Sequence, residues 1–128
     1  MGRATAVLLL AVLAVGCKPA PAAPDYSTGE FQVVGSGAVT HANIYYQAFD
    51  GAGMNVLYNV DVTSPGWSHS FSGVQVGDEY FLAAQSNDDA TVPGDVLTID
   101  VLVDGTSLGG PKTTTDPFGY VALYGTVP

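Results

Sequence analysis

The sequence predicts an all-β protein, folded as an immunoglobulin-like β-sandwich of seven to eight mainly antiparallel strands. Turn residues, among them 16 glycines and 8 prolines, separate short apolar runs at nearly regular spacing. No window shows the 3.6-residue apolar period of a helix. A β-barrel of similar strand count is the alternative. The runs themselves alternate apolar and polar residues at a period of two, most clearly at Leu97, Ile99, Val101 and Val103.

The first 16 residues do not belong to this fold, and their pattern is typical of an export signal. Arg3 supplies a positive start, residues 4–15 are apolar apart from Thr5, and Gly16-Cys17 follows. A positive start, a short apolar run and a small residue at the cleavage point are the parts of a secretory signal. The apolar run is too short for a membrane-spanning helix, which needs about 20 residues.

The end of this signal, Leu13 to Cys17, resembles that of bacterial lipoproteins. In that family the signal is cut before the cysteine, whose sulfur then carries diacylglycerol. We therefore expect residues 1–16 to be removed and Cys17, the only cysteine, to be lipidated. Lys18 follows, and by resemblance to enterobacterial sorting a residue other than Asp there favours the outer over the inner membrane. The predicted location is the bacterial cell envelope.

Residues 17–28 are expected to be a tether, and residues 29–128 the β-sandwich domain. Prolines at 19, 21 and 24 and several alanines make the tether semi-extended, with about 3 Å of reach per residue. The whole chain has a net charge of −9, and loss of Arg3 leaves only Lys18 and Lys112 against twelve acids. A domain this acidic excludes nucleic acid as a partner, and it leaves the lipid as the means of membrane attachment.

Strands are expected, in order, at residues 31–35, 41–49, 54–62, 67–71, 80–85, 96–103, 106–113 and 120–127. Asp104-Gly105 is a two-residue hairpin signal, which makes Asp100 a strand-face residue and Asp104 a turn residue. The partner at 106–113 is expected to be an irregular edge, because Gly109-Gly110-Pro111 cannot sustain a ladder. The two inner faces are predicted to hold Val33, Ile44, Tyr46, Val56, Tyr58, Val60, Trp67, Phe71, Leu82, Ile99, Val101, Val121 and Leu123.

Five short motifs occur together in one order along this domain: Gly35-Ser36-Gly37-Ala38, Pro65 to Phe71, Tyr80 to Ser86, Ile99 to Gly105, and Gly119 to Ala122. In this order they are similar to the soluble domain of the MmpS family. The resemblance implies an extracytoplasmic β-sandwich that is an accessory protein to MmpL-type exporters of the resistance-nodulation-division class. Mycobacterial members carry an amino-terminal transmembrane helix where this chain carries a lipoprotein signal.

Aspartates in and after one polar loop are candidate metal ligands. Calcium takes six to eight oxygen ligands, and Asp88, Asp89 and Asp95 lie in an exported acidic segment. They lack the regular spacing of an EF-hand loop, so they are weak candidates. The favoured alternative is that they are solvating turn carboxylates. No cofactor is expected.

Three tyrosines are candidates for a binding surface, because outward-facing tyrosine binds sugar rings or partner proteins. Tyr45 lies opposite Ile44 in its strand, and Tyr120 and Tyr124 lie opposite Val121 and Leu123. The favoured alternative is that both faces of a central strand are partly covered. Trp67 is assigned to the core.

Catalysis is not expected. His41 and His69, the two histidines, have no partner at metal-site spacing, and the G-x-S-x-G nucleophile pattern is missing. The leading hypothesis is a lipid-anchored envelope interaction module, serving an exporter or another envelope protein. The second is a carbohydrate- or calcium-binding β-sandwich without catalysis.

Overall fold

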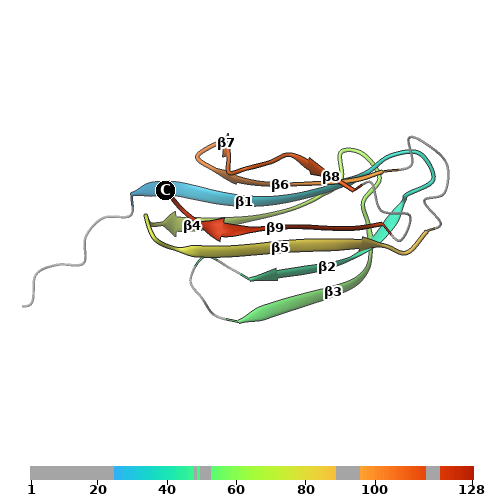
Figure 1. Ribbon diagram of the computed structural model, residues 1–128, viewed down its shortest axis with the longest axis horizontal. Helices are drawn as coiled ribbons and strands as arrows, with labels where there is room; N and C mark the ends of the chain where they lie inside the picture. Colours follow the sequence, from blue (N-terminus) through green and yellow to red (C-terminus); the bar gives the residue numbers. More distant parts are fainter. Residues whose placement is uncertain (1–24, 48, 50–52, 89–95, 115–118) are drawn as a thin grey trace, which may run out of the picture.

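The computed structural model confirms the all-β prediction. It describes residues 25–47, 49, 53–88, 96–114 and 119–128, and these residues form nine strands in two antiparallel sheets with no helix. No helix long and apolar enough to cross a membrane occurs within those ranges. The two sheets pack face to face as a β-sandwich (Figure 1).

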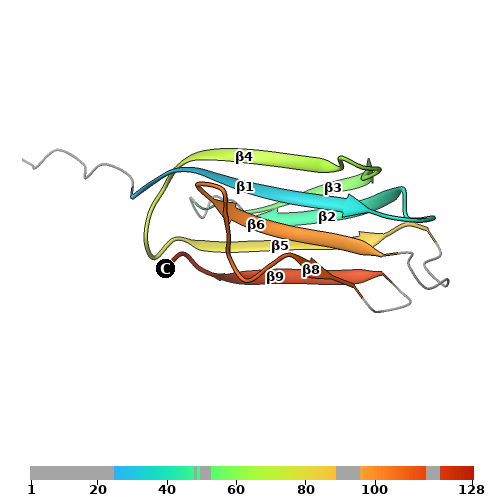
Figure 2. The ribbon, with the colours of Figure 1, turned by 90° about the horizontal axis from the view of Figure 1, so that it is seen from above.

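Sheet A has the order β4-β1-β6-β7, and β8 also pairs with β6, at Thr98 and Ile99, whereas β7 pairs with Leu102 and Val103. Sheet B has the order β3-β2-β5-β9. Figure 2 shows the two layers, with β4 at one rim of sheet A and β9 close to β6 and β8 at the opposite rim. Sheet A is formed by β1 (Tyr26–Gly35), β4 (Trp67–Val74), β6 (Leu97–Val103), β7 (Thr106–Ser107) and β8 (Lys112–Thr113), and sheet B by β2 (His41–Gln47), β3 (Met54–Asp61), β5 (Glu79–Ser86) and β9 (Tyr120–Thr126).

The strand with the clearest alternation, β6, lies inside sheet A between β1 and the short strands β7 and β8. Every second side chain from Leu97 to Val103 is buried, as predicted. Asp104 and Gly105 have positive φ values of 46° and 80°, which fit the predicted hairpin turn. The predicted irregular partner is also confirmed, because only the two-residue pieces β7 and β8 pair with β6 there.

The core lies between the sheets around Phe31 of β1. Its ring centroid is 5.7 Å from that of Tyr46 and 5.2 Å from that of Phe71, so both sheets contribute rings to one cluster. Trp67, predicted to be core, packs against this cluster but is only partly buried, because β4 is an edge strand. Burial is complete at Phe31, Val33, Ile44, Leu82, Leu97, Ile99 and Val101.

The first strand begins five residues earlier than predicted. Tyr26 pairs with Val74 and Thr28 with Ser72, so residues 26–28, assigned to the tether, belong to β1. The sequence signal was weak because Ser27 and Thr28 are polar. Their backbone N–H groups instead donate hydrogen bonds to the Asp104 carboxylate, and the distance from Thr28 N to Asp104 Oδ1 is 2.8 Å. Residues 17–24, including Cys17, lie outside the described residues.

The predicted inner face of the third strand is half wrong. Val60 and Val62 face inward, but Val56 is 39% exposed and Tyr58 is 75% exposed. The register between β2 and β3 shifts by one residue, because Ala42 pairs with Val60 whereas Ile44 pairs with Leu57. A single extra residue reverses the faces of everything on one side of it, so Leu57 points inward in place of Val56 and Tyr58.

The extra residue lies at Asn59, whose φ is +53°. Asparagine tolerates this left-handed conformation better than other residues with a side chain. Asn43 Oδ1 accepts hydrogen bonds from Asn59 N at 2.9 Å and from Asn87 Nδ2 at 3.1 Å. Asn87 Nδ2 also donates to Asn59 Oδ1 at 3.2 Å. These three asparagines hold the bulge in place.

Candidate functional site

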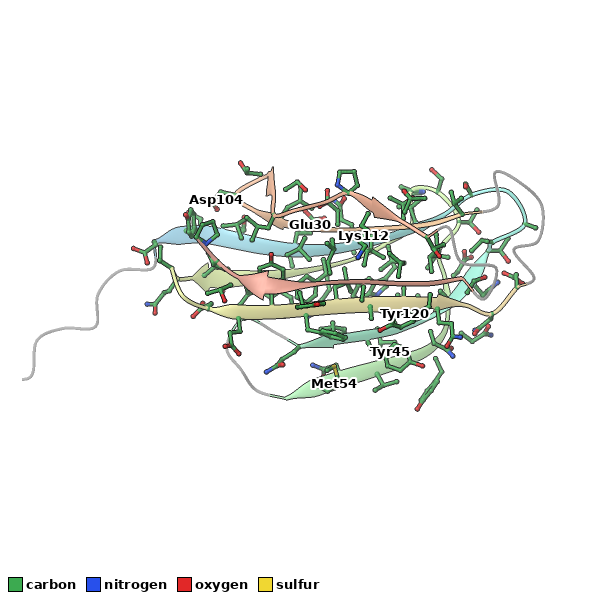
Figure 3. The ribbon with its side chains drawn as sticks, in the orientation of Figure 1. Glu30, Tyr45, Met54, Asp104, Lys112 and Tyr120 are labelled. Atoms are coloured by element: carbon green, nitrogen blue, oxygen red, sulfur yellow. The ribbon has the colours of Figure 1, made fainter. Side chains whose placement is uncertain are left out.

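The structure brings the three predicted tyrosines onto one surface, the outer face of sheet B. Tyr45 is on β2, and Tyr120 and Tyr124 are on β9, with β5 between the two strands. Figure 3 labels Tyr45 and Tyr120 on this face. Their side chains point away from the core because their strand neighbours Ile44, Val121 and Leu123 are buried.

Four further apolar residues complete this surface. Met54 and Val56 come from β3, and the bulge places Tyr58 on the same face; Phe81 comes from β5. We name the whole surface the tyrosine face and define it as Tyr45, Met54, Val56, Tyr58, Phe81, Tyr120 and Tyr124. Sequence reasoning missed Val56 and Tyr58, because the uninterrupted alternation from 56 to 62 gives no sign of a bulge. Phe81 could have been found, since it alternates with the core residue Leu82.

Strand pairing sets the arrangement of these side chains. Tyr45 faces Val56 on one side and Ala83 on the other, and Phe81 faces Tyr124. Facing residues in neighbouring strands have Cβ atoms about 5 Å apart, so the side chains form continuous rows across the sheet. Ala83 is 1% exposed although it lies on this outer face. The larger side chains around it therefore shield part of the sheet surface from water.

The tyrosine face is the main exposed apolar surface of the described part of the chain. Large apolar side chains are exposed there at Met54, Val56, Tyr58, Tyr120 and Tyr124, and otherwise only at Val76, in the turn between β4 and β5. Single exposed apolar residues are common on proteins, but a contiguous group marks a surface that binds something.

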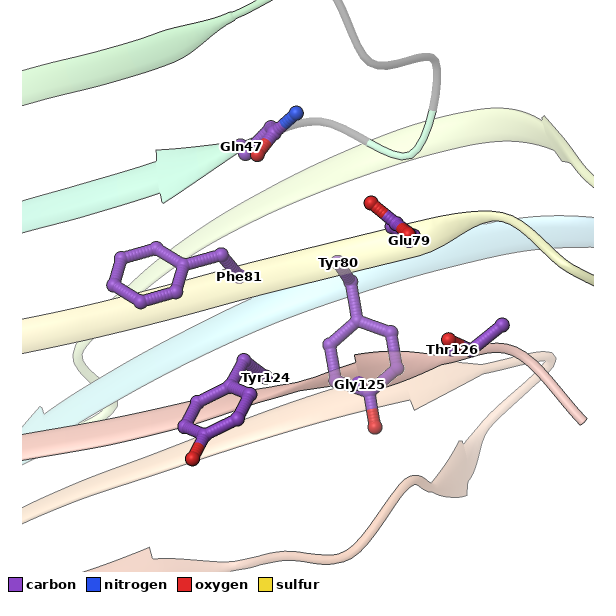
Figure 4. A pocket seen from close by; sticks show the side chains of 7 residues that line it. All are labelled: Gln47, Glu79, Tyr80, Phe81, Tyr124, Gly125 and Thr126. Atoms are coloured by element: carbon purple, nitrogen blue, oxygen red, sulfur yellow. The ribbon is translucent and has the colours of Figure 1, made fainter.

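Two shallow depressions lie on this face and meet at Phe81. One, of about 340 Å³, is lined by Tyr45, Met54, Phe81, Ala83, Gln85 and Tyr120. The other, of about 550 Å³, is lined by Gln47, Glu79, Tyr80, Phe81, Tyr124, Gly125 and Thr126 (Figure 4). Both are open hollows that expose ring surfaces and glutamine amides, and neither is an enclosed cavity.

The tyrosine face carries little charge although the chain is strongly acidic. Its seven members are uncharged, and the polar side chains lining its depressions include Gln47, Gln85 and Thr126. Glu79, at the first position of β5, is the one acid among the lining residues. An apolar partner surface can therefore approach the centre of this face without burying an unpaired charge.

Asp88, a weak candidate for a metal ligand, accepts hydrogen bonds that stabilise the fold. Its Oδ2 accepts hydrogen bonds from Thr40 N at 2.8 Å and His41 N at 3.0 Å, and from the Thr40 hydroxyl at 3.2 Å. The Thr40 N–H and then the His41 N–H lower the pKa of Asp88 below its ordinary value of 3.8. The carboxylate therefore braces the start of β2. Asp89 and Asp95 lie outside the described residues.

The described ranges contain no group of three or more His, Cys, Asp or Glu side chains suited to holding a metal ion. Asp100 accepts a hydrogen bond from the Ser107 hydroxyl at 2.6 Å, and Asp104 braces β1. His41 Nδ1 lies 2.9 Å from the Thr40 hydroxyl, and His69 packs among rings on β4. The predicted lipidation site, Cys17, is not among the described residues.

No protein-family model matches this chain, and no curated protein matches it in sequence. The resemblance to the MmpS family therefore stays a prediction from five short motifs. The tyrosine face is the feature of the structure on which a functional proposal can rest.

Proposed function

We propose that this protein is a lipid-anchored interaction module of the bacterial cell envelope, which binds a partner protein through the tyrosine face. The observation that carries the proposal is a group of seven uncharged, mostly aromatic side chains on an outer sheet face of a chain with a net charge of −9. The outward side of an antiparallel sheet is ordinarily polar. The inner face alone builds the core, so folding does not account for exposed rings at Tyr120 and Tyr124.

The composition of the face suits a protein partner. Tyrosine and methionine are enriched at protein interfaces, where charged residues are depleted from the centre. Tyrosine supplies a large contact area with only two side-chain torsions to immobilise. The seven side chains stand on four paired strands, so the rigid sheet holds them ready for binding.

The remaining parts of the proposal rest on the sequence. Lipid at Cys17 would hold the protein at a membrane, outer rather than inner, and residues 18–25 would separate the domain from it. The resemblance to the MmpS family makes an exporter of the resistance-nodulation-division class the first partner to test. Another envelope protein is the broader form of the same proposal.

The test places a photo-crosslinking amino acid at Tyr124 of the full chain, expressed in its own cells. We expect one envelope protein to be captured reproducibly and to be identified by mass spectrometry. Tyr120→Ser should weaken its capture at least about tenfold, as loss of an interface hot spot does. The control is Val76→Ser, which removes an apolar side chain outside the face that is 58% exposed, against 47% for Tyr120.

Two results would contradict the proposal. One is a crosslinked species containing only this chain or no protein at all. The other is equal loss of capture in Val76→Ser and Tyr120→Ser, which would mean that general hydrophobic adhesion, and not this face, retains the partner. Circular dichroism melting of each variant verifies that the fold is intact.

Glycan binding is a second candidate, supported by the two depressions. Each combines aromatic ring surface with a glutamine amide, Gln85 beside Tyr120 and Gln47 beside Phe81. Rings can stack on sugars while amides bind hydroxyl groups. A thermal shift with a glycan panel that Tyr124→Ser abolishes would favour this function. If no glycan in the panel shifts the melting temperature, the glycan-binding function is ruled out.

A further inference from the structure

Among the residues that the structure describes, three of the four sheet edges are interrupted or covered, and one has neither feature. An open edge presents unpaired backbone groups that can pair with another strand. On β9, the Lys112 amine donates to the Ala122 carbonyl at 3.0 Å, and the Thr114 hydroxyl donates to the Tyr120 carbonyl at 3.0 Å. On β3, the bulge at Asn59 breaks the regular ladder. The edge formed by β7 and β8 consists of two-residue pieces.

The fourth edge, β4, has none of these protections. In the part of the chain that the structure describes, β4 pairs only with β1, and Figure 2 shows it at the rim of sheet A. Its register with β1 is constant from Trp67 to Val74. It contains no proline and no charged residue, and its one positive φ is at Gly73, near its end. Residues Trp67 to Ser72 therefore form a regular, uncharged edge.

The hydrogen bonds of β1 show which backbone groups of β4 face outward. Thr28 O accepts from Asp104 N on the β6 side, whereas Gly35 N donates to Val62 O on the opposite side. Backbone groups of successive residues point to opposite edges, so the odd residues of β1 bond to β4. These pair with Trp67, His69 and Phe71. The N–H and C=O groups of Ser68, Ser70 and Ser72 are then left at the free edge.

A row of rings runs along the inner side of this edge. His69 lies between Trp67 and Phe71, at 6.1 Å and 4.5 Å between ring centroids, and Tyr46 of β2 is 5.3 Å from it. Trp67 and Phe71 are only partly buried, and His69 is exposed. A strand added beside β4 would cover the open side of this row.

We propose that β4 pairs with β4 of a second copy of this chain, antiparallel and across a two-fold axis at Ser70, to make one continuous sheet. The strand is self-complementary in this arrangement, because Ser68 faces Ser72 of the second copy and each facing pair can exchange two hydrogen bonds.

The lack of charged residues along β4 allows a second, equally acidic copy of the chain to approach this edge. Two copies of a chain with a net charge of −9 repel each other. The electrostatic repulsion at their contact is smallest where both contacting surfaces are uncharged. β4 offers eight consecutive uncharged residues, whereas the edge strand β3 is interrupted by the bulge and ends in Asp61. The proposal does not depend on the tyrosine face, which belongs to the other sheet.

The test measures the mass of the full chain in detergent by sedimentation, under reducing conditions so that Cys17 cannot crosslink. We expect a monomer–dimer equilibrium for the wild type. Ser70→Asp and Ser70→Lys should each weaken the dimer about tenfold or more, since like charges then face each other at the axis. An equal mixture of the two variants should pair again. Ser70→Ala, which keeps the backbone groups, should dimerise like the wild type.

Several outcomes would overturn the proposal. They are a wild type that stays monomeric at all attainable concentrations, variants that dimerise as strongly as the wild type, or a mixture that fails to pair although both variants melt at the wild-type temperature. If Tyr124→Ser abolishes dimerisation and Ser70→Asp does not, the dimer interface is the tyrosine face and not β4.

Discussion

The two outer faces of the sandwich differ sharply although both belong to antiparallel sheets around one core. Sheet A shows mainly polar side chains outward: Thr28, Glu30, Gln32, Ser68, Ser70, Ser72, Thr98 and Asp100. Sheet B shows the tyrosine face. The inner faces of both are apolar, because the core requires it. The outer face of sheet A therefore has the composition expected of a wetted sheet, and that of sheet B has the composition of a binding surface.

The largest predicted effect tests whether stability comes from the inner faces alone. Phe31→Ala should lower the free energy of unfolding by about 3–5 kcal/mol, because it removes a fully buried ring that contacts others in both sheets. Urea titration followed by circular dichroism measures it. Tyr124→Ala, which removes a 74% exposed ring, should change the same quantity by no more than about 0.5 kcal/mol. Equal losses would show that the tyrosine face is part of the folding core.

A second prediction concerns the bulge that enlarges the tyrosine face. Asn59→Ala should cost about 1 kcal/mol of stability, since alanine is strained at a φ of +53° and loses the contact with Asn87. Asn59→Gly should recover most of the strain. Urea titration of both variants compares them. If alanine is as stable as asparagine, the left-handed conformation does not hold the bulge.

A third prediction compares the carboxylates that brace the two sheets. The Thr28 and then the Ser27 N–H groups lower the pKa of Asp104 below 3.8, as the Thr40 and His41 N–H groups do for Asp88. Because the folded pKa lies below the unfolded value, the stabilisation is present above pH about 4 and is lost as the pH falls through the folded pKa.

Asp104→Asn and Asp88→Asn should therefore each be less stable than the wild type at neutral pH, with the difference shrinking in acid. Thermal melting across the pH range measures it. A stability difference that does not change with pH would mean that the charge of these carboxylates does not contribute to the bracing.

The smallest effect is expected on the outer face of sheet A. Gln32→Ala removes a partly buried amide whose hydrogen bond goes to Glu30, two residues away, at 3.1 Å. We expect a stability change within about 0.5 kcal/mol and no change in crosslinking at Tyr124. Loss of partner capture in this variant would contradict the assignment of binding to sheet B.

Much of the fold could be predicted because its signals are local. The alternation from Leu97 to Val103, the Asp104-Gly105 turn and the weak edge after it all appear in the structure as expected. The start of β1 could not be predicted from alternation, because Ser27 and Thr28 are held through Asp104, which is distant in the sequence. The outward orientation of Tyr45, Tyr120 and Tyr124 can be predicted because side chains alternate between the two faces of a strand. This alternation does not depend on which strands are the partners.

The sequence by itself determined the fold class and the inward face of most strands, since both follow from a period of two between turn residues. Tertiary structure decided the rest. A one-residue bulge at Asn59 reversed half of β3 and added Val56 and Tyr58 to the surface of the three predicted tyrosines. Strand order decided which strands lie at the edges, and among the described residues β4 pairs on one side only. Bulges and strand order depend on contacts between residues far apart in the chain, so the local pattern does not encode them.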